Sequence, residues 1–460
     1  MNQGFSLKVK PQYDPSFCPA TLYNKAFLEA VEKSGQGVPA AIAIERNNGL
    51  VSVHRTKVFS DGSEKFDQNF LYIERLAKAL LWIRGGYKII FGGPRKIGEY
   101  LKKAYAEGGL RAFDAEFMAR VYEQPFEVVV TDYEQVPAEK EETRPAGRHL
   151  DGCRIGFDAG GSDRKVSAVI DGKVVYSEEV VWHPKTNSDP DYHYEGIVTA
   201  LRTAASHMPR VDAIGVSSAG VYVNNRAMIA SLFLKVPQEL FDKKVKDIYI
   251  RAAREFGDIP LVVANDGDVT ALAGAIDLND GNVLGIAMGT SEAGGYVDKQ
   301  GNITGWLNEL AFVPADYNRG AMLDEWSGDF GCGVKYFSQD AVIKLAPAAG
   351  ISLDESSSPA EKLKVVQKLH EEGDERAAGI FQTIGCYLGY TLAFYAEFYD
   401  IEHVLILGRV TSGKGGAIIL ETAEKVIREE FPELSRKMKL ELPDESDRRV
   451  GQSIAAASLA

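Results

Sequence analysis

The stretch RIGFDAGGSDRK, residues 154–165, decides the fold. Its apolar run ends in Asp158, and small and polar residues follow, namely Gly160, Gly161, Ser162 and Lys165. The next residues, VSAVIDGKVVYSEEVVW, alternate and turn like a second and a third strand. A glycine-rich turn between strands exposes backbone N–H groups to a phosphate, and a carboxylate at the strand end can hold a phosphate-bound Mg²⁺ through water. The alternative is an ordinary Asp-Gly-Gly hairpin without a ligand.

Three later segments repeat the pattern of an apolar run that ends in a polar or glycine turn. They are VVANDGDVTALAGA (262–275), GIAMGTSEAGGYVDKQGNITG (285–305) and HVLILGRVTSGKGGAIILETAEKVI (403–427). The first predicts a strand, then Asn265-Asp266, then a helix of small residues. A nucleotide cleft between two α/β lobes requires such strand ends in this order, so the set is more specific than any one member.

The ordered set resembles the ROK family of sugar kinases, within the hexokinase–actin superfamily, over residues 151–460. The resemblance implies an α/β protein with a ribonuclease-H-like, two-lobed actin/hexokinase fold. It also implies phosphoryl transfer from ATP, with Mg²⁺, to a hydroxyl of a sugar or sugar-like polyol, and a homodimer. We expect lobes at 151–262, with 441–460 returning to it, and at 263–440.

The resemblance, read with the chemistry of phosphoryl transfer, implies a role for each matched residue. Phosphoryl transfer needs a base, a phosphate cage and charge neutralisation. Asp266, at a strand end where helix N–H groups keep it anionic, is the predicted base, although an aspartate there can also simply cap the helix. The predicted nucleotide contacts are Asp158, Gly160, Gly161, Ser162, Lys165, Gly289, Thr290, Ser291, Gly408 and Gly413. Asp158 is also predicted to hold Mg²⁺ through water. The resemblance implies substrate contacts at Asn265 and Glu309. Asn224, with Asn225 beside it, is a further predicted substrate contact, and plain turn chemistry is the alternative.

Several positions depart from the family pattern. Ser291 and Glu292 follow the GT pair, and a carboxylate near a triphosphate would repel it unless it faces the substrate or the metal; a solvent-facing turn is the alternative. Arg409 stands where a second glycine would approach the adenosine. Phe312 replaces the sugar-binding histidine, and it can stack on a ring but cannot bond to its hydroxyls. Cys332 stands alone, without the family's zinc cysteines, and is expected to be a buried hydrophobe.

Composition excludes several classes of protein. The net charge of −13 argues against non-specific nucleic-acid binding, and the four widely spaced cysteines favour a reduced, cytoplasmic setting. The N-terminal residues contain no signal-peptide core, and no apolar run is long enough to span a membrane. The seven histidines have no metal-ligand spacing. The segment HPKTNSDPDYH (183–193) is predicted as a solvated loop, with a lid as the alternative.

The N-terminal third, residues 1–132, forms a separate α/β domain in our prediction, followed by a charged, proline-containing linker at 133–150. Its order of strand, turn, strand, helix and strand matches that of residues 154–220. Either it is a degenerate copy of the same unit, without the paired glycines and the lysine, or packing rules alone produce the order.

Three functions stay open on the sequence. The first is an ATP-dependent sugar kinase, which Asp158, Lys165 and Asp266 favour. The second is a non-catalytic sugar- or nucleotide-binding regulator, and the third is a superfamily ATPase or phosphotransferase acting on a non-sugar substrate. The departures at Phe312, Glu292 and Arg409 keep the last two open.

Overall fold

The computed structural model describes residues 4–142, 147–443 and 452–460. These residues divide into two compact units. Of the described residues, the first unit contains 4–142, 286–294 and 306–442, and the second contains 147–285, 295–305, 443 and 452–460. The chain passes between the units within two of its strands. This division differs from the predicted segments, because residues 263–285 group with the first predicted lobe and the N-terminal third groups with most of the second.

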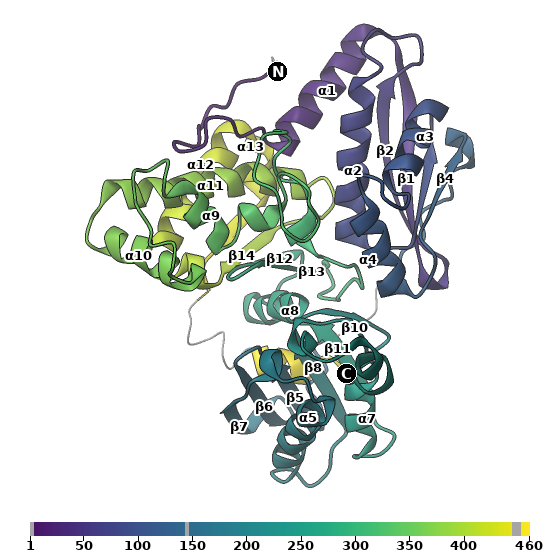
Figure 1. Ribbon diagram of the computed structural model, residues 1–460. Helices are drawn as coiled ribbons and strands as arrows, with labels where there is room; N and C mark the ends of the chain where they lie inside the picture. Colours follow the sequence, from purple (N-terminus) through teal and green to yellow (C-terminus); the bar gives the residue numbers. More distant parts are fainter. Residues whose placement is uncertain (1–3, 143–146, 444–451) are drawn as a thin grey trace. The chain divides into compact units, whose positions relative to one another are not determined.

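The N-terminal third is a four-stranded sheet with helices (Figure 1). The strand order is β2-β1-β3-β4. The elements are α1 (Ala20–Ser34), β1 (Gly37–Arg46), β2 (Leu50–Phe59), α2 (Gln68–Arg84), β3 (Lys88–Gly92), α3 (Arg95–Ala104), α4 (Ala112–Tyr122) and β4 (Glu127–Thr131). The predicted hairpin turn lies at residues 47–49, where Asn48 and Gly49 both adopt positive φ. Helices α1 and α2 pack on β1 and β2.

The N-terminal third is not a degenerate copy of the following unit, because the strand pairing differs. Strand β3 runs antiparallel to β1, whereas the equivalent strand of the second unit, β8, runs parallel to β5. The alternative explanation therefore holds, since similar element order arises from packing alone. Of the predicted linker, Lys140 pairs with Val51, and residues 143–146 lie outside the described residues.

The second unit contains a five-stranded sheet of order β11-β8-β5-β6-β7. Its strands β5, β6 and β7 are antiparallel neighbours, while β5, β8 and β11 are parallel, the mixed pairing of a ribonuclease-H-like sheet. The elements are β5 (Cys153–Ala159), β6 (Asp163–Ile170), β7 (Lys173–Val181), α5 (Pro190–Ala205), β8 (Ala213–Ser218), β9 (Val221–Val223), β10 (Arg226–Ile229), α6 (Gln238–Leu240), α7 (Ile248–Arg254), β11 (Leu261–Asn265) and α8 (Asp266–Leu278).

The C-terminal helix at residues 452–457 lies against this sheet where two glycines allow it. A Cβ atom at Gly156 or Gly215 would collide with the backbone of that helix. The absence of side chains on β5 and β8 at these points therefore lets the helix backbone approach the sheet closely.

The remaining part of the first unit is a second sheet, of order β13-β12-β14-β15, with long helices. Helices α11 and α12 pack along each other, and a Cβ at Gly385 or Gly389 of α11 would lie 2.6 Å and 2.5 Å from atoms of α12. The elements are β12 (Val283–Met288), β13 (Glu292–Val297), α9 (Gln339–Leu345), α10 (Pro359–Glu371), α11 (Glu375–Tyr395), β14 (His403–Leu407), α12 (Lys414–Glu430), α13 (Pro432–Lys437) and β15 (Lys439–Glu441). Among the described residues, no helix combines the length and the apolarity needed to cross a bilayer.

Candidate functional site

The glycine hairpin between β5 and β6 is held in shape by Trp182. The backbone N–H of Trp182 donates to the carbonyl of Ser162 at 3.1 Å, and its indole N–H donates to the carbonyl of Gly160 at 2.8 Å. A Cβ at Gly160 would lie 2.6 Å from the carbonyl oxygen of Asp163. Neither Gly160 nor Gly161 has a positive φ, so the turn needs glycine for close approach and not for an unusual backbone conformation.

A lysine that the sequence analysis did not select lies over this turn. A Cβ at Gly161 would be 2.6 Å from Cε and 2.8 Å from Nζ of Lys185. Lys185 belongs to the short 3₁₀ helix Pro184–Thr186, in the segment predicted as a solvated loop. No local pattern marks it, because its approach to Gly161 depends on how residues 182–190 fold back. The predicted lysine, Lys165, instead pairs with Asp163 at 3.3 Å.

Asp158 lies at the end of β5, opposite Lys165 in the ladder, and is 7% exposed. Burial raises the pKa of its carboxyl to about 6, against the opposing effects of Ser217 and Lys165. The carboxylate of Asp266 adds to this rise. A cation bound at this strand end would favour the ionised form of Asp158.

Asn265 and Asp266 lie where β11 ends and α8 begins. The Asn265 side chain caps the helix, accepting from Gly267 N–H at 2.7 Å and donating to the Gly220 carbonyl at 2.7 Å. Asp266 is thus the first helical residue and not the cap, and its Oδ1 lies 3.1 Å from the same N–H. Burial raises the pKa of Asp266, while this N–H and Lys185 oppose the rise. Asp268 has a different contact, accepting from the backbone N–H of Tyr296 at 3.2 Å.

Two predicted nucleotide turns lie together in the first unit. The Gly289–Ser291 turn joins β12 to β13, with Thr290 and Ser291 exposed. At the end of β14, Gly408 has φ +106, and a Cβ there would collide with the backbone of Met288. The close approach of these strand ends explains the glycine at 408. Gly413, with φ +67, precedes α12, whose first N–H donates to the Glu371 carboxylate at 3.3 Å.

Glu292 is not part of a solvent-facing turn. It is 3% exposed, and the Tyr395 hydroxyl donates to its Oε1 at 3.4 Å, while its Oε2 is buried without a partner. Burial raises the pKa of Glu292 to about 8, and the neighbouring carboxylate of Glu309 adds to the rise. Glu309, the predicted sugar contact, is partly exposed. The buried carboxyl group of Glu292 is close enough to interact with it electrostatically.

Phe312 and Asn225 make structural contacts, whereas Asn224 is exposed. Phe312 stacks on Trp82, with ring centroids 4.2 Å apart and an interplanar angle of 28°. Asn225 bridges to β11, donating to the Leu261 carbonyl at 2.8 Å and accepting from Val263 N–H at 2.9 Å. Asn224, predicted as a substrate contact, is exposed and has φ +52 in the same turn.

The predicted site residues thus fall into separate groups in the two units. In the second unit, Asp158 and Lys165 pair across β5 and β6, while Asn265 and Asp266 lie at the end of β11, which β8 separates from β5. In the first unit, Gly408 approaches the backbone of Met288, next to Gly289 in the chain, and the Glu309 carboxylate acts electrostatically on Glu292. Among the described residues, no cluster of three or more His, Cys, Asp and Glu side chains has the geometry of a metal site. All four cysteines are buried and free.

Comparison with solved structures identifies the fold. A ROK hexokinase from Thermus thermophilus matches with a TM-score of 0.52 and 18% identity, over 66% of this chain and 97% of that one. A ROK transcriptional regulator, a homologue of the E. coli MLC protein, matches with a TM-score of 0.50 and 18% identity, over 67% of this chain and 79% of that one. The chain has the hexokinase–actin-like fold of these ROK proteins. No family model and no curated protein matches the sequence.

Proposed function

We propose that the protein is an ATP-dependent kinase that phosphorylates a hydroxyl group of a sugar or a sugar-like polyol. The observation that carries the proposal is the position of Asp266, at the first turn of α8 and within electrostatic reach of Asp158 at the glycine hairpin. The fold shared with a ROK hexokinase supports this proposal. The homodimer and the cytoplasmic location stay predictions.

In the proposed reaction Asp266 accepts the proton of the attacking hydroxyl. Burial raises its pKa towards the working pH, which strengthens it as a base. The N-terminal end of α8 and the ammonium of Lys185 stabilise the anionic form before the proton arrives. Asn265, already fixed by two hydrogen bonds, holds the end of β11 beside the base.

The glycine hairpin and its lysines would hold the phosphates of ATP. The turn at Gly160–Ser162 presents backbone N–H groups, and Lys185 lies over Gly161. Magnesium, when bound with the nucleotide, would neutralise phosphate charge, and Asp158 would hold it through water. The donor set fits this role, because a divalent cation would favour the ionised form of the Asp158 carboxyl, which burial disfavours. In the first unit, Gly289, Thr290, Ser291, Gly408 and Gly413 stay predicted nucleotide contacts.

A phosphotransfer assay with Asp266→Asn tests the proposal. A panel of sugars and polyols is first screened with Mg-ATP by thermal shift, since a ligand of the native state raises the melting temperature. Turnover of the best acceptor is then measured. We expect Asp266→Asn to lower kcat by about 10²–10⁴-fold, the usual contribution of a general base. Asp268→Asn, in the same helical turn, serves as the matched control and should keep turnover. Equal turnover in Asp266→Asn and wild type would contradict the assignment.

A sugar- or nucleotide-binding regulator is the second candidate. The packing of Phe312 against Trp82 favours it, because this side chain offers no hydrogen bond to a sugar hydroxyl. A ROK regulator shares the fold. Stabilisation by a sugar, with no phosphorylated product from any acceptor of the panel, would favour this function over the kinase.

A further inference from the structure

The C-terminal end of helix α2 binds the backbone of the segment that contains Glu309. The last carbonyls of a helix have no partner within it. Here the carbonyls of Trp82, Ile83 and Arg84 accept N–H groups from Glu309, Asn308 and Leu307 at 3.1, 3.0 and 3.3 Å. The predicted acceptor contact is therefore attached, through its own backbone N–H, to the N-terminal third.

Side chains on both sides strengthen this attachment. Trp82 stacks on Phe312, and the guanidinium of Arg84 lies 3.3 Å from the centroid of the Trp306 ring. Gly85, with φ +74, follows α2, and a Cβ there would lie 3.0 Å from Cβ of Leu307 and collide with Tyr122. Trp82 and Arg84 of α2 thus hold the two ends of the segment 306–312, through Phe312 and Trp306. The close approach of Leu307 and Tyr122 to residue 85 requires glycine at that position.

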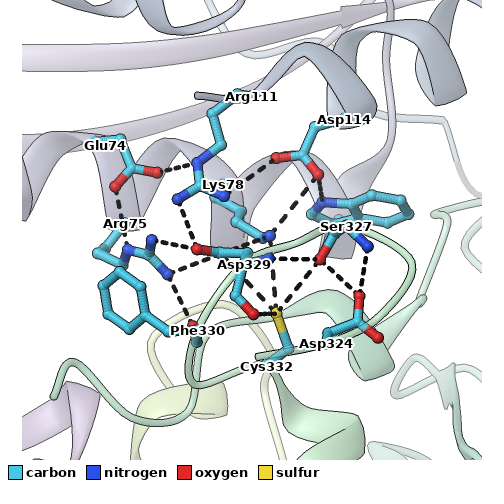
Figure 2. A network of polar contacts seen from close by, with 11 residues as sticks. Glu74, Arg75, Lys78, Arg111, Asp114, Asp324, Ser327, Asp329, Phe330 and Cys332 are labelled. Atoms are coloured by element: carbon cyan, nitrogen blue, oxygen red, sulfur yellow. Dashed lines mark hydrogen bonds and ion pairs between the residues drawn. The ribbon is translucent and has the colours of Figure 1, made fainter. Parts of the chain in front are cut away.

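A buried network of charged groups forms the second attachment (Figure 2). Asp329 accepts from Arg75 at 2.7 and 2.9 Å, from Lys78 at 2.7 Å and from Arg111 at 2.8 Å. Glu74 pairs with both arginines, and Asp114 with Lys78. These six side chains are 2% exposed or less, and their three cations match three carboxylates. Five of the six come from the N-terminal third, so this part of the chain holds Asp329 in place.

We infer that the N-terminal third is a positioning element for acceptor recognition, with Trp82 as its principal positioning residue. The inference rests on the proposed function, because it gives the acceptor contact to Glu309. The N-terminal third supplies the surface on which residues 306–312 are ordered, and through them it sets the position of the Glu309 carboxylate beside Glu292. Trp82 does so without touching the acceptor.

The substitution Trp82→Leu tests the inference in the full-length protein. It removes the ring that stacks on Phe312 and leaves the residues proposed to bind the nucleotide unchanged. We expect kcat/KM for the acceptor to fall by about ten- to a hundredfold, as for small misplacements of a substrate contact. The KM for ATP should change little, and backbone amides of residues 306–312 should exchange hydrogen faster. Trp82→Phe, which retains an aromatic ring, should restore most of the loss.

Phe91→Leu is the matched control, because Phe91 is also fully buried in the N-terminal third, in β3 of its sheet. It should lower stability without a specific change in the acceptor KM or in exchange at 306–312. If Trp82→Leu does not fold, Phe312→Leu removes the same stack from the other side and should give the same result. Unchanged acceptor kinetics and unchanged exchange would overturn the inference. If the wild type phosphorylates no acceptor, the proposed function fails and the acceptor-positioning role fails with it; faster exchange at 306–312 in Trp82→Leu would then show only the attachment.

Discussion

Replacing Asp329 by asparagine should destabilise the first unit strongly. The carboxylate accepts hydrogen bonds from Arg75, Lys78 and Arg111, and these cations hold its pKa far below the usual range. Asparagine keeps the shape and removes the charge, which leaves three buried cations facing two carboxylates. Breaking a buried ion pair by removing one partner costs about 3–5 kcal/mol. At about 2–4 °C per kcal/mol for domains of 150–250 residues, the melting temperature should fall by about 6–20 °C.

Calorimetry of Asp329→Asn, Lys78→Met and the double variant separates charge balance from lost contacts. The double variant restores equal numbers of cations and carboxylates, so its loss should be clearly smaller than the sum of the two single losses. The pH dependence has a definite sign. Since the pKa of Asp329 is depressed in the folded state, its carboxylate stabilises the fold above pH about 4, and this stabilisation is lost as the pH falls below that value. The stability of Asp329→Asn should not show this fall with pH. Additive losses, or a fall of less than about 2 °C in Asp329→Asn, would refute the reasoning.

Three further predictions concern the candidate site. Asp158→Ala and Gly161→Val should each weaken the binding of Mg-ATP, measured by calorimetry. The first removes a negative charge, and the second displaces Lys185 from the turn. Unchanged affinity in both variants would refute the predicted phosphate site. Glu292→Gln should become more stable relative to wild type as the pH rises from about 4.5 to 8, by up to about 1.4 kcal/mol per pH unit. The reason is that the pKa of Glu292 is raised in the folded state, so its ionisation opposes folding of the wild type. An equal dependence of the melting temperature on pH in both proteins would contradict this. Asn225→Ala should lower the melting temperature and leave nucleotide affinity unchanged, because its bonds go to β11.

The parts of the site that the sequence predicts well are those formed by neighbouring residues. The hairpin of Asp158 and Lys165, the strand end at Asn265 and the turn at Gly289 all appear where the local pattern places them. Each depends on a strand, a glycine or polar turn and the next element, which are encoded within about a dozen residues. Their grouping as a site still depends on the proposed function.

The features that the sequence does not predict depend on long-range contacts. Lys185 lies over Gly161 only because residues 182–190 fold back on the hairpin. Glu292 follows a glycine turn and would ordinarily be exposed, yet Tyr395 from α11 covers it. The order of elements in the N-terminal third does not reveal that β3 pairs antiparallel with β1, because the same order is compatible with both directions.

Helix α2 shows why the N-terminal third and residues 306–332 are expected to fold together. Its sequence FLYIERLAKALLWIRG contains Glu74, Arg75 and Lys78, which periodicity alone would place on a solvated face. In the structure all three are buried, together with the apolar residues around the helix. Burying these charges without partners would cost several kcal/mol each, so α2 in this position is stable only when Asp329 is in place. Conversely, Asp329 and the backbone N–H groups of residues 307–309 lack these partners without α2. The two segments therefore stabilise each other, and acceptor recognition at Glu309 should be lost in any variant in which α2 does not pack.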